Sequence, residues 1–283
     1  MKFILFLILL LGAIYASLWF FSRNTYPIEF GISFNQNHAS YLGLDWKKVY
    51  SAMLQELKPK YIRIAAMWSE VEKEKGKYDF GDVDWMMDQA AKHGVKVVLV
   101  VGQKAPRWPE CYVPEWAREL PSPQLALIDY VQKVAERYRG HSALEIWQVE
   151  NEPFIKFRFG DCAGYRADMV DEEIALVRAL DPNHKIIITD SGELSTWRKA
   201  IRAADLFGTS VYRVVRTPLD TVFTYDWLPA SIYRFKAMIN KKDLSQVYIS
   251  ELQAEPWFTD TRPADTPIAE QEATMTPERL QKN

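Results

Sequence analysis

Two glutamates follow apolar segments in a way that suits acid–base chemistry. Glu152 comes near the end of the stretch 144–154, LEIWQVENEPF, in which an apolar strand gives way to polar residues and is stopped by Pro153. Glu251 directly follows the apolar segment 246–250, QVYIS. Two carboxyl groups at one site can cleave a glycosidic bond, because one attacks the anomeric carbon while the other protonates the leaving oxygen. Such chemistry requires a fold that brings these two distant residues together.

The elements that must do so alternate between apolar strands and amphipathic helices. Strands are expected at 28–34, 61–65, 95–101, from 144, and at 185–189, 206–211 and 246–250. Helices are expected at 45–57, 82–94, 124–138, 165–180, 194–204 and 228–238, with a polar loop at 35–40. This alternation predicts parallel pairing, and the continuously apolar strands indicate a sheet covered on both faces. Seven such units favour a (β/α)8 barrel of the TIM type over a doubly wound sheet.

In a barrel of this class, functional side chains lie at the carboxyl ends of the strands. The residues that this rule selects are Arg63, Trp68, Glu150, Asn151, Glu152, Tyr212 and Glu251. The rule places these residues, which are far apart in the sequence, at one end of the predicted barrel.

The motif W-x-x-x-N-E-P at 147–153 resembles the fourth-strand motif of the clan A retaining glycoside hydrolases, which include the cellulase-like families. The segment 68–80, WSEVEKEKGKYDF, is similar to the second loop and helix start of the same enzymes. The resemblance covers about residues 31–257. It implies a TIM barrel that hydrolyses β-glycosidic bonds of a polysaccharide or oligosaccharide by double displacement, without a cofactor.

In that family the acid/base and the nucleophile come from the fourth and seventh strands, which are the positions of Glu152 and Glu251. The resemblance implies that Glu251 is the ionised nucleophile and that Glu152 keeps its proton because of the neighbouring negative charge. It further implies that Asn151 holds a sugar hydroxyl, while Arg63 and Tyr212 position the nucleophile. The other interpretation of Arg63 and Tyr212 is a purely structural one.

Other acidic and aromatic residues give alternatives to these assignments. Glu150 lies two residues before Glu152 and is a second candidate for the acid, and Glu255 is a second candidate for the nucleophile. Trp68 and Trp257 follow strands and are candidates for stacking on sugar, although a tryptophan there suits packing between loops equally well. The glutamates at 70, 72 and 74 are expected on a solvated surface.

Composition and charge exclude several other classes of protein. The chain has 283 residues and a formal net charge of −2, which does not favour nucleic-acid binding. The four histidines form no H-x-H pair and no cluster with metal-ligand spacing, so we expect no metal site. Neither a G-x-G-x-x-G nor a phosphate-loop pattern occurs, so no nucleotide cofactor is indicated.

The first residues predict an association with a membrane. The run 3–21 carries no charge and is almost long enough to span a bilayer. A cleavable signal peptide would have a shorter apolar core, so we expect 1–24 to be an uncleaved anchor, with secretion after cleavage as the alternative. The remainder would be extracytoplasmic, where Cys111 and Cys162 are permitted to form a disulfide; two free thiols are the alternative.

The last residues predict a barrel that stops early. A helix start at 276–280 is followed by only three residues, and no eighth strand appears. We therefore expect domain 25–283 to be a barrel truncated after its seventh strand, or else a naturally open barrel. In the family, the absent unit usually brings a tryptophan that forms the floor under the reactive sugar. This departure favours an alternative function, a carbohydrate-binding or envelope scaffold barrel without turnover.

Overall fold

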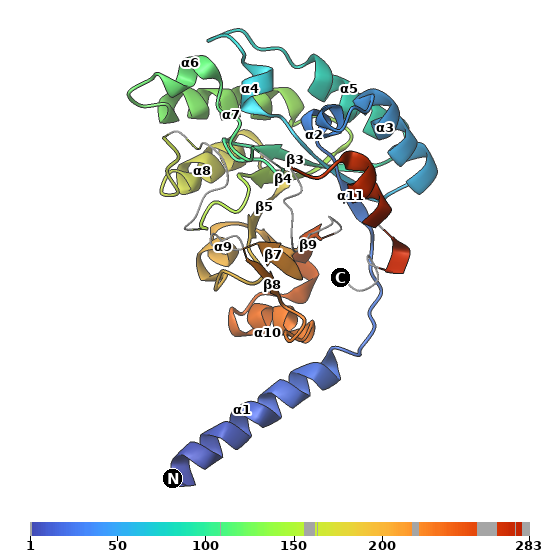
Figure 1. Ribbon diagram of the computed structural model, residues 1–283. Helices are drawn as coiled ribbons and strands as arrows, with labels where there is room; N and C mark the ends of the chain where they lie inside the picture. The colour runs from blue at the N-terminus through green and yellow to red at the C-terminus, as the bar shows by residue number, and fades with distance from the viewer. Residues whose placement is uncertain are drawn as a thin grey trace. The chain divides into compact units, whose positions relative to one another are not determined.

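The computed structural model describes residues 2–107, 109–155, 162, 164–216, 221–253, 265–274 and 276–278 (Figure 1). The chain divides into two compact units. The larger unit comprises Glu29–Thr209, and the other comprises Met1–Ile28 together with Ser210–Asn283. The boundaries of the anchor and barrel domains stay a prediction.

The central feature is a seven-stranded sheet in the order β1-β2-β3-β4-β5-β6-β9. Its strands are β1 (Gly31–Ser33), β2 (Tyr61–Ala65), β3 (Lys96–Val101), β4 (Leu144–Val149), β5 (Lys185–Asp190), β6 (Leu206–Val211) and β9 (Val247–Leu252). Each strand from β1 to β5 pairs in parallel with the next one along the chain. A sheet that never reverses its order is typical of a (β/α) barrel and not of a doubly wound sheet, so the predicted fold class is confirmed.

Helices separate the strands, as the sequence predicts. The larger unit contains α2 (Gln36–Tyr41), α3 (Trp46–Ala52) with a π-helical turn (Met53–Leu57), α4 (Trp68–Val71), α5 (Gly81–Lys92), α6 (Glu115–Arg118), α7 (Gln124–Tyr138), α8 (Val170–Leu180) and α9 (Arg198–Ala203). The other unit contains α1 (Lys2–Phe21), the antiparallel strands β7 (Val214–Arg216) and β8 (Val222–Thr224), α10 (Ser231–Ile239), a 3-10 turn (Leu244–Gln246) and α11 (Ile268–Thr274).

The core of the larger unit forms because its strands are apolar on both faces. In β3, the side chains of Val97, Leu99, Val100 and Val101 are at most 1% exposed, although successive side chains point to opposite faces. Helix α7 has the bounds that its apolar spacing predicts. The side chains that it buries are Leu127, Tyr130, Val131, Val134, Ala135 and Tyr138. Fully burying a valine or leucine side chain contributes roughly 1.5–3 kcal/mol, so both elements stabilise the unit.

Helix α2 (Gln36–Tyr41) lies where the sequence predicts a polar loop at 35–40. The Asn35 side chain caps α2 by accepting a hydrogen bond from the His38 N–H at 2.9 Å. Its amide nitrogen donates to the Tyr112 hydroxyl at 2.9 Å and to the Pro106 carbonyl at 3.0 Å. The prediction was wrong because this short helix lacks a repeated apolar stripe, and its cap is held by contacts that arise only in the folded chain.

In the other unit, α1 contacts α10 and the segment before it. The Ser231 N–H donates to the Ser22 hydroxyl at 2.9 Å, and the Tyr15 hydroxyl donates to the Trp227 carbonyl. By length and composition alone, α1 is suited to crossing a membrane, as is the signal sequence of a secreted protein. The predicted apolar helix is therefore present at the expected residues.

Candidate active site

The backbone after β4 makes an unusual turn that presents Glu152. Glu150 and Glu152 have φ angles of 60° and 44°, in the left-handed region that costs a residue other than glycine about 1–3 kcal/mol. Both neighbouring strands hold this turn. The Glu150 N–H donates to the Val101 carbonyl of β3 at 2.8 Å, and the Glu152 N–H donates to the Thr189 hydroxyl of β5 at 2.9 Å. The position of Glu152 is thus set by the strands on either side of its own.

A buried polar network lies beside this turn. The Arg63 guanidinium, on β2, donates to the Gln148 side-chain oxygen and to the Asn151 side-chain oxygen, each at 2.8 Å. The Thr189 hydroxyl donates to the same Asn151 oxygen at 3.3 Å. Because that oxygen accepts these bonds, the amide nitrogen is the Asn151 atom that can donate to a sugar hydroxyl. The structure therefore brings Arg63 to Asn151. Sequence reasoning missed Gln148 and Thr189, which carry no motif of their own.

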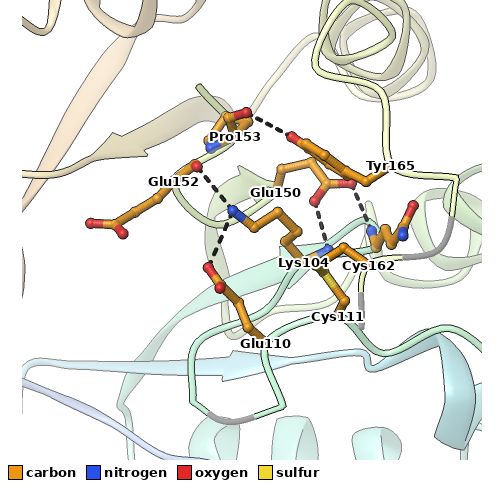
Figure 2. Close-up of a disulfide and its surroundings, with 9 residues drawn as sticks. Lys104, Glu110, Cys111, Glu150, Glu152, Pro153, Cys162 and Tyr165 are labelled. Atoms are coloured by element: carbon orange, nitrogen blue, oxygen red, sulfur yellow. Dashed lines mark hydrogen bonds and ion pairs between the residues drawn. A yellow bond between two sulfur atoms is a disulfide. The ribbon is translucent and has the colours of Figure 1, made fainter. Parts of the chain in front are cut away.

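The two glutamates of the turn differ in where their carboxyl groups lie (Figure 2). The Glu152 residue is 9% exposed, and its carboxyl points away from Lys104, which instead contacts the Glu152 carbonyl. The Glu150 residue is fully buried, and its two carboxylate oxygens accept the backbone N–H groups of Gln103 at 2.7 Å and of Lys104 at 2.6 Å. Glu150 therefore ties the loop after β3 to the loop after β4, which does not support the alternative of Glu150 as the acid.

Glu150 also contacts a second buried carboxyl group, that of Glu173 on α8. Burial raises the pKa of Glu150 to about 7, against the lowering effect of the two N–H groups that it accepts. Burial and the charge of Glu150 raise the pKa of Glu173 well above its usual value. The pair therefore favours the retention of a proton at neutral pH, an arrangement that suits a structural contact.

In the other unit, Glu251 has a defined partner. Tyr212 directly follows β6, and its hydroxyl donates to a Glu251 carboxylate oxygen at 3.0 Å. Glu251 lies within β9, which extends one residue beyond it, and not after the strand as its sequence suggests. Gln253 is 1% exposed and its side-chain oxygen accepts the N–H groups of Arg213 and Val214, each at 2.9 Å. These bonds fix the backbone that follows Tyr212.

The tryptophans predicted to stack on sugar can be compared with the structure only in part. Trp68 is completely buried, and it stacks on Tyr130 with ring centroids 5.7 Å apart and meets Trp116 edge-on. Its indole N–H donates to Glu72, which is itself 2% exposed and not part of a solvated surface. No face of Trp68 is accessible to a sugar, so its prediction as a substrate-binding residue was wrong. Trp257, Trp108 and Glu255 lie outside the described residues.

The two cysteines are joined in the structure. Cys111 and Cys162 form a disulfide with their Cα atoms 5.1 Å apart. It links the loop after β3 to the segment between β4 and α8 (Figure 2). Within the described part of the chain, no group of three or more His, Cys, Asp or Glu residues is arranged to hold a metal ion.

Comparison with known proteins identifies the group of sequences to which these features belong. A sequence model of the family described as Cellulase (glycosyl hydrolase family 5) matches residues 27–225. The β-galactosidase LacZ of Heyndrickxia coagulans is 31% identical over 104 residues, which are 30% of this chain and 16% of that protein. The probable mannan endo-1,4-β-mannosidase F of Aspergillus flavus is 27% identical over 133 residues, which are 41% of this chain and 26% of that protein.

Solved structures are similar in fold. A β-galactosidase from the Antarctic haloarchaeon Halorubrum lacusprofundi matches with a TM-score of 0.58 and 15% identity, over 83% of this chain and 49% of that one. Xylanase 10B from Thermotoga maritima matches with a TM-score of 0.56 and 15% identity, over 87% of this chain and 75% of that one. At these identities the likeness shows the fold, which is the predicted barrel.

Proposed function

Because the chain belongs to the cellulase family, glycosyl hydrolase family 5, we propose that it is a retaining β-glycosidase with Glu152 as acid/base and Glu251 as nucleophile. The observation that carries this proposal is the placement of the two glutamates. Glu152 follows the fourth strand of the sheet, and Glu251 lies on the seventh. Double displacement requires the two carboxyl groups to be about 5–5.5 Å apart.

The reaction would proceed in two steps. In the first, a Glu251 oxygen attacks the anomeric carbon, the glycosidic bond breaks, and the leaving oxygen takes the Glu152 proton. In the second, water gives a proton to Glu152 and attacks the same carbon, which releases Glu251. The Tyr212 hydroxyl would orient Glu251, and the Asn151 amide would donate to a sugar hydroxyl. Neither step needs a cofactor.

The substrate is proposed to be a β-linked oligosaccharide or polysaccharide. The names of the relatives include β-galactosidase and endo-β-mannosidase. Aryl β-glycosides of galactose, mannose, glucose and xylose, together with the corresponding oligosaccharides, therefore form the first panel to test. Binding of such oligosaccharides without hydrolysis would select the non-catalytic alternative.

Substitution of the two glutamates tests the mechanism. Glu152→Gln and Glu251→Gln should each lower kcat at least about 100-fold, which is the lower range for acid–base catalysis. Glu145→Gln is the control, because it changes a half-buried glutamate at the other end of β4, whose partner is Lys96. Wild-type rates in either test variant would overturn the assignment. If NMR shows the inverted anomer as the first product, the retaining mechanism is wrong.

We also propose that α1 anchors the protein to a membrane, with the barrel on the extracytoplasmic side. The helix is 20 residues long, and Trp19 near its end is of the kind found at membrane interfaces. The disulfide supports an oxidising compartment.

A further inference from the structure

Two side chains hold the consecutive carbonyl groups of Glu152 and Pro153 (Figure 2). The Lys104 ammonium donates to the Glu152 carbonyl at 3.1 Å, and the Tyr165 hydroxyl donates to the Pro153 carbonyl at 3.0 Å. The ammonium also lies 5.4 Å from the centroid of the Tyr165 ring. We call Lys104 and Tyr165 the carbonyl clamp.

Lys104 is built into the interior of its unit. It is 2% exposed, and its ammonium forms an ion pair with Glu110 at 3.2 Å. Its backbone N–H is held by the Glu150 carboxylate. Removing an ammonium from water is costly unless it is well paired, so a lysine that served only solubility would be expected on the surface. The hydrogen bond from Lys104 to the Glu152 carbonyl therefore indicates that this lysine has a role in holding the Glu152 turn.

The disulfide ties the two halves of the clamp together. Cys111 directly follows Glu110, the ion-pair partner of Lys104, and pairs with Lys104 in an antiparallel bridge. Cys162 accepts the Tyr165 N–H at 3.2 Å through its carbonyl. The covalent link between the cysteines thus joins the loop that carries Lys104 to the segment that carries Tyr165.

We propose that Lys104 and Tyr165 are positioning residues, which orient the Glu152 carboxyl by holding the carbonyls of Glu152 and Pro153. The inference rests on the proposed function of Glu152. With a φ of 44°, Glu152 has a conformation that its surroundings must enforce. Its N–H is held by Thr189, and the clamp holds the other side of the residue. A misplacement of a reacting group by 1 Å can cost about 100-fold in rate, so relaxation of this turn would be measurable.

The test is the dependence of kcat/KM on the leaving group of aryl β-glycosides. A general acid matters most for a poor leaving group, such as a phenol, and least for a dinitrophenol. Lys104→Met and Tyr165→Phe should lower kcat/KM about 10- to 100-fold with the phenol and less than about 3-fold with the dinitrophenol. Lys104→Arg, which keeps a donor and a charge, should recover part of the loss.

Matched controls exist in the same unit. Lys96→Met removes a lysine at the other end of β3, where it pairs with Glu145 at 3.1 Å. Tyr78→Phe removes a hydroxyl that donates to Asp129 at 2.8 Å. Both controls should keep the wild-type dependence on the leaving group.

Each outcome decides the question. An equal loss with both leaving groups would mean a purely structural role and would overturn the proposal, as would wild-type behaviour of both clamp variants. If Lys104→Met does not fold, Tyr165→Phe, which deletes a single hydroxyl, decides alone. A wild-type enzyme that hydrolyses no glycoside of the panel overturns the proposed function, and this inference with it. Activity that persists in Glu152→Gln overturns the proposed function separately.

Discussion

Glu150 and Glu152 are two residues apart and have opposite surroundings. The left-handed backbone at both positions turns the first carboxylate into the loop after β3 and lets the second point away from Lys104. The first carboxylate accepts two backbone N–H groups and contacts a second buried carboxyl, that of Glu173. The residue type alone therefore does not separate a structural glutamate from a candidate acid; the hydrogen-bond partners do.

The Glu150–Glu173 pair predicts that stability depends on pH. Its pKa values are raised on folding, so the native state holds protons that the unfolded chain has lost. The resulting stabilisation of the folded state is complete below the pKa that these groups have in the unfolded chain. It is lost as the pH rises through about 7, the pKa of Glu150 in the folded protein. The free energy of unfolding should therefore fall between pH 5.5 and 8, by at most about 1.4 kcal/mol per pH unit for each proton.

Glu173→Gln should flatten this dependence, because an amide donates to Glu150 without titrating. Urea unfolding at pH 5.5 and pH 8 measures the difference. Asp171→Asn, which changes an exposed acidic residue in the first turn of α8, is the control. Equal pH dependence in wild type and Glu173→Gln would contradict the role given to the pair.

Gly102 offers a second prediction at the scale of one residue. Its φ is +126°, and a Cβ atom there would lie 2.6 Å from the Glu150 carboxyl. Gly102→Ala should lower the free energy of unfolding by at least about 2 kcal/mol, through backbone strain and overpacking. Gly140→Ala is the control, since a Cβ at that position meets no atom within 4 Å. A urea midpoint within about 0.5 M of that of the Gly140→Ala control would contradict the close contact.

At the scale of elements, the candidate site depends on the ends of strands and on the links between the loops that follow them. Strand β4 lies between β3 and β5, and the turn that follows it donates backbone hydrogen bonds to both neighbouring strands. The loops beyond β3 and β4 are then fastened by a disulfide and by the carbonyl clamp. The sheet thus places the loops that follow β3 and β4 side by side, and the contacts between these loops set the orientation of the turn that carries Glu152.

The disulfide should contribute strongly to stability. Its cysteines are 51 residues apart in sequence, and closing a loop of that length in the unfolded chain is worth about 4 kcal/mol in the chain-entropy account. Dithiothreitol, or the double substitution Cys111→Ser and Cys162→Ser, should therefore lower the midpoint of urea unfolding. Dithiothreitol should have no effect on the double variant. An unchanged midpoint of the wild type under reducing conditions would contradict this contribution.

At the scale of the whole molecule, the chain joins an apolar helix to a barrel of the cellulase family. If α1 is the anchor that we propose, one charge in its middle should weaken membrane retention. Leu10→Arg places an arginine there at a cost of about 2.5–3.5 kcal/mol. The full chain with Leu10→Arg should appear in the soluble fraction after an alkaline wash, while Leu10→Ile should stay with the membrane. Equal retention of the two variants would count against a spanning helix.

The sequence by itself determined the order of the seven sheet strands, the fold class and the family. Apolar periodicity reflects burial, which each segment carries in its own residues, and the motif at 147–153 is local. Only the tertiary structure decided the roles of Trp68, Glu72 and Glu150, because each depends on partners that are distant in sequence or on an unusual backbone angle. The helix at 36–41 was missed for the same reason, since its cap, Asn35, is held by Tyr112 and Pro106. Hydrogen bonds between distant segments leave no periodic signal in a sequence, and it is they that orient the side chains of the candidate site.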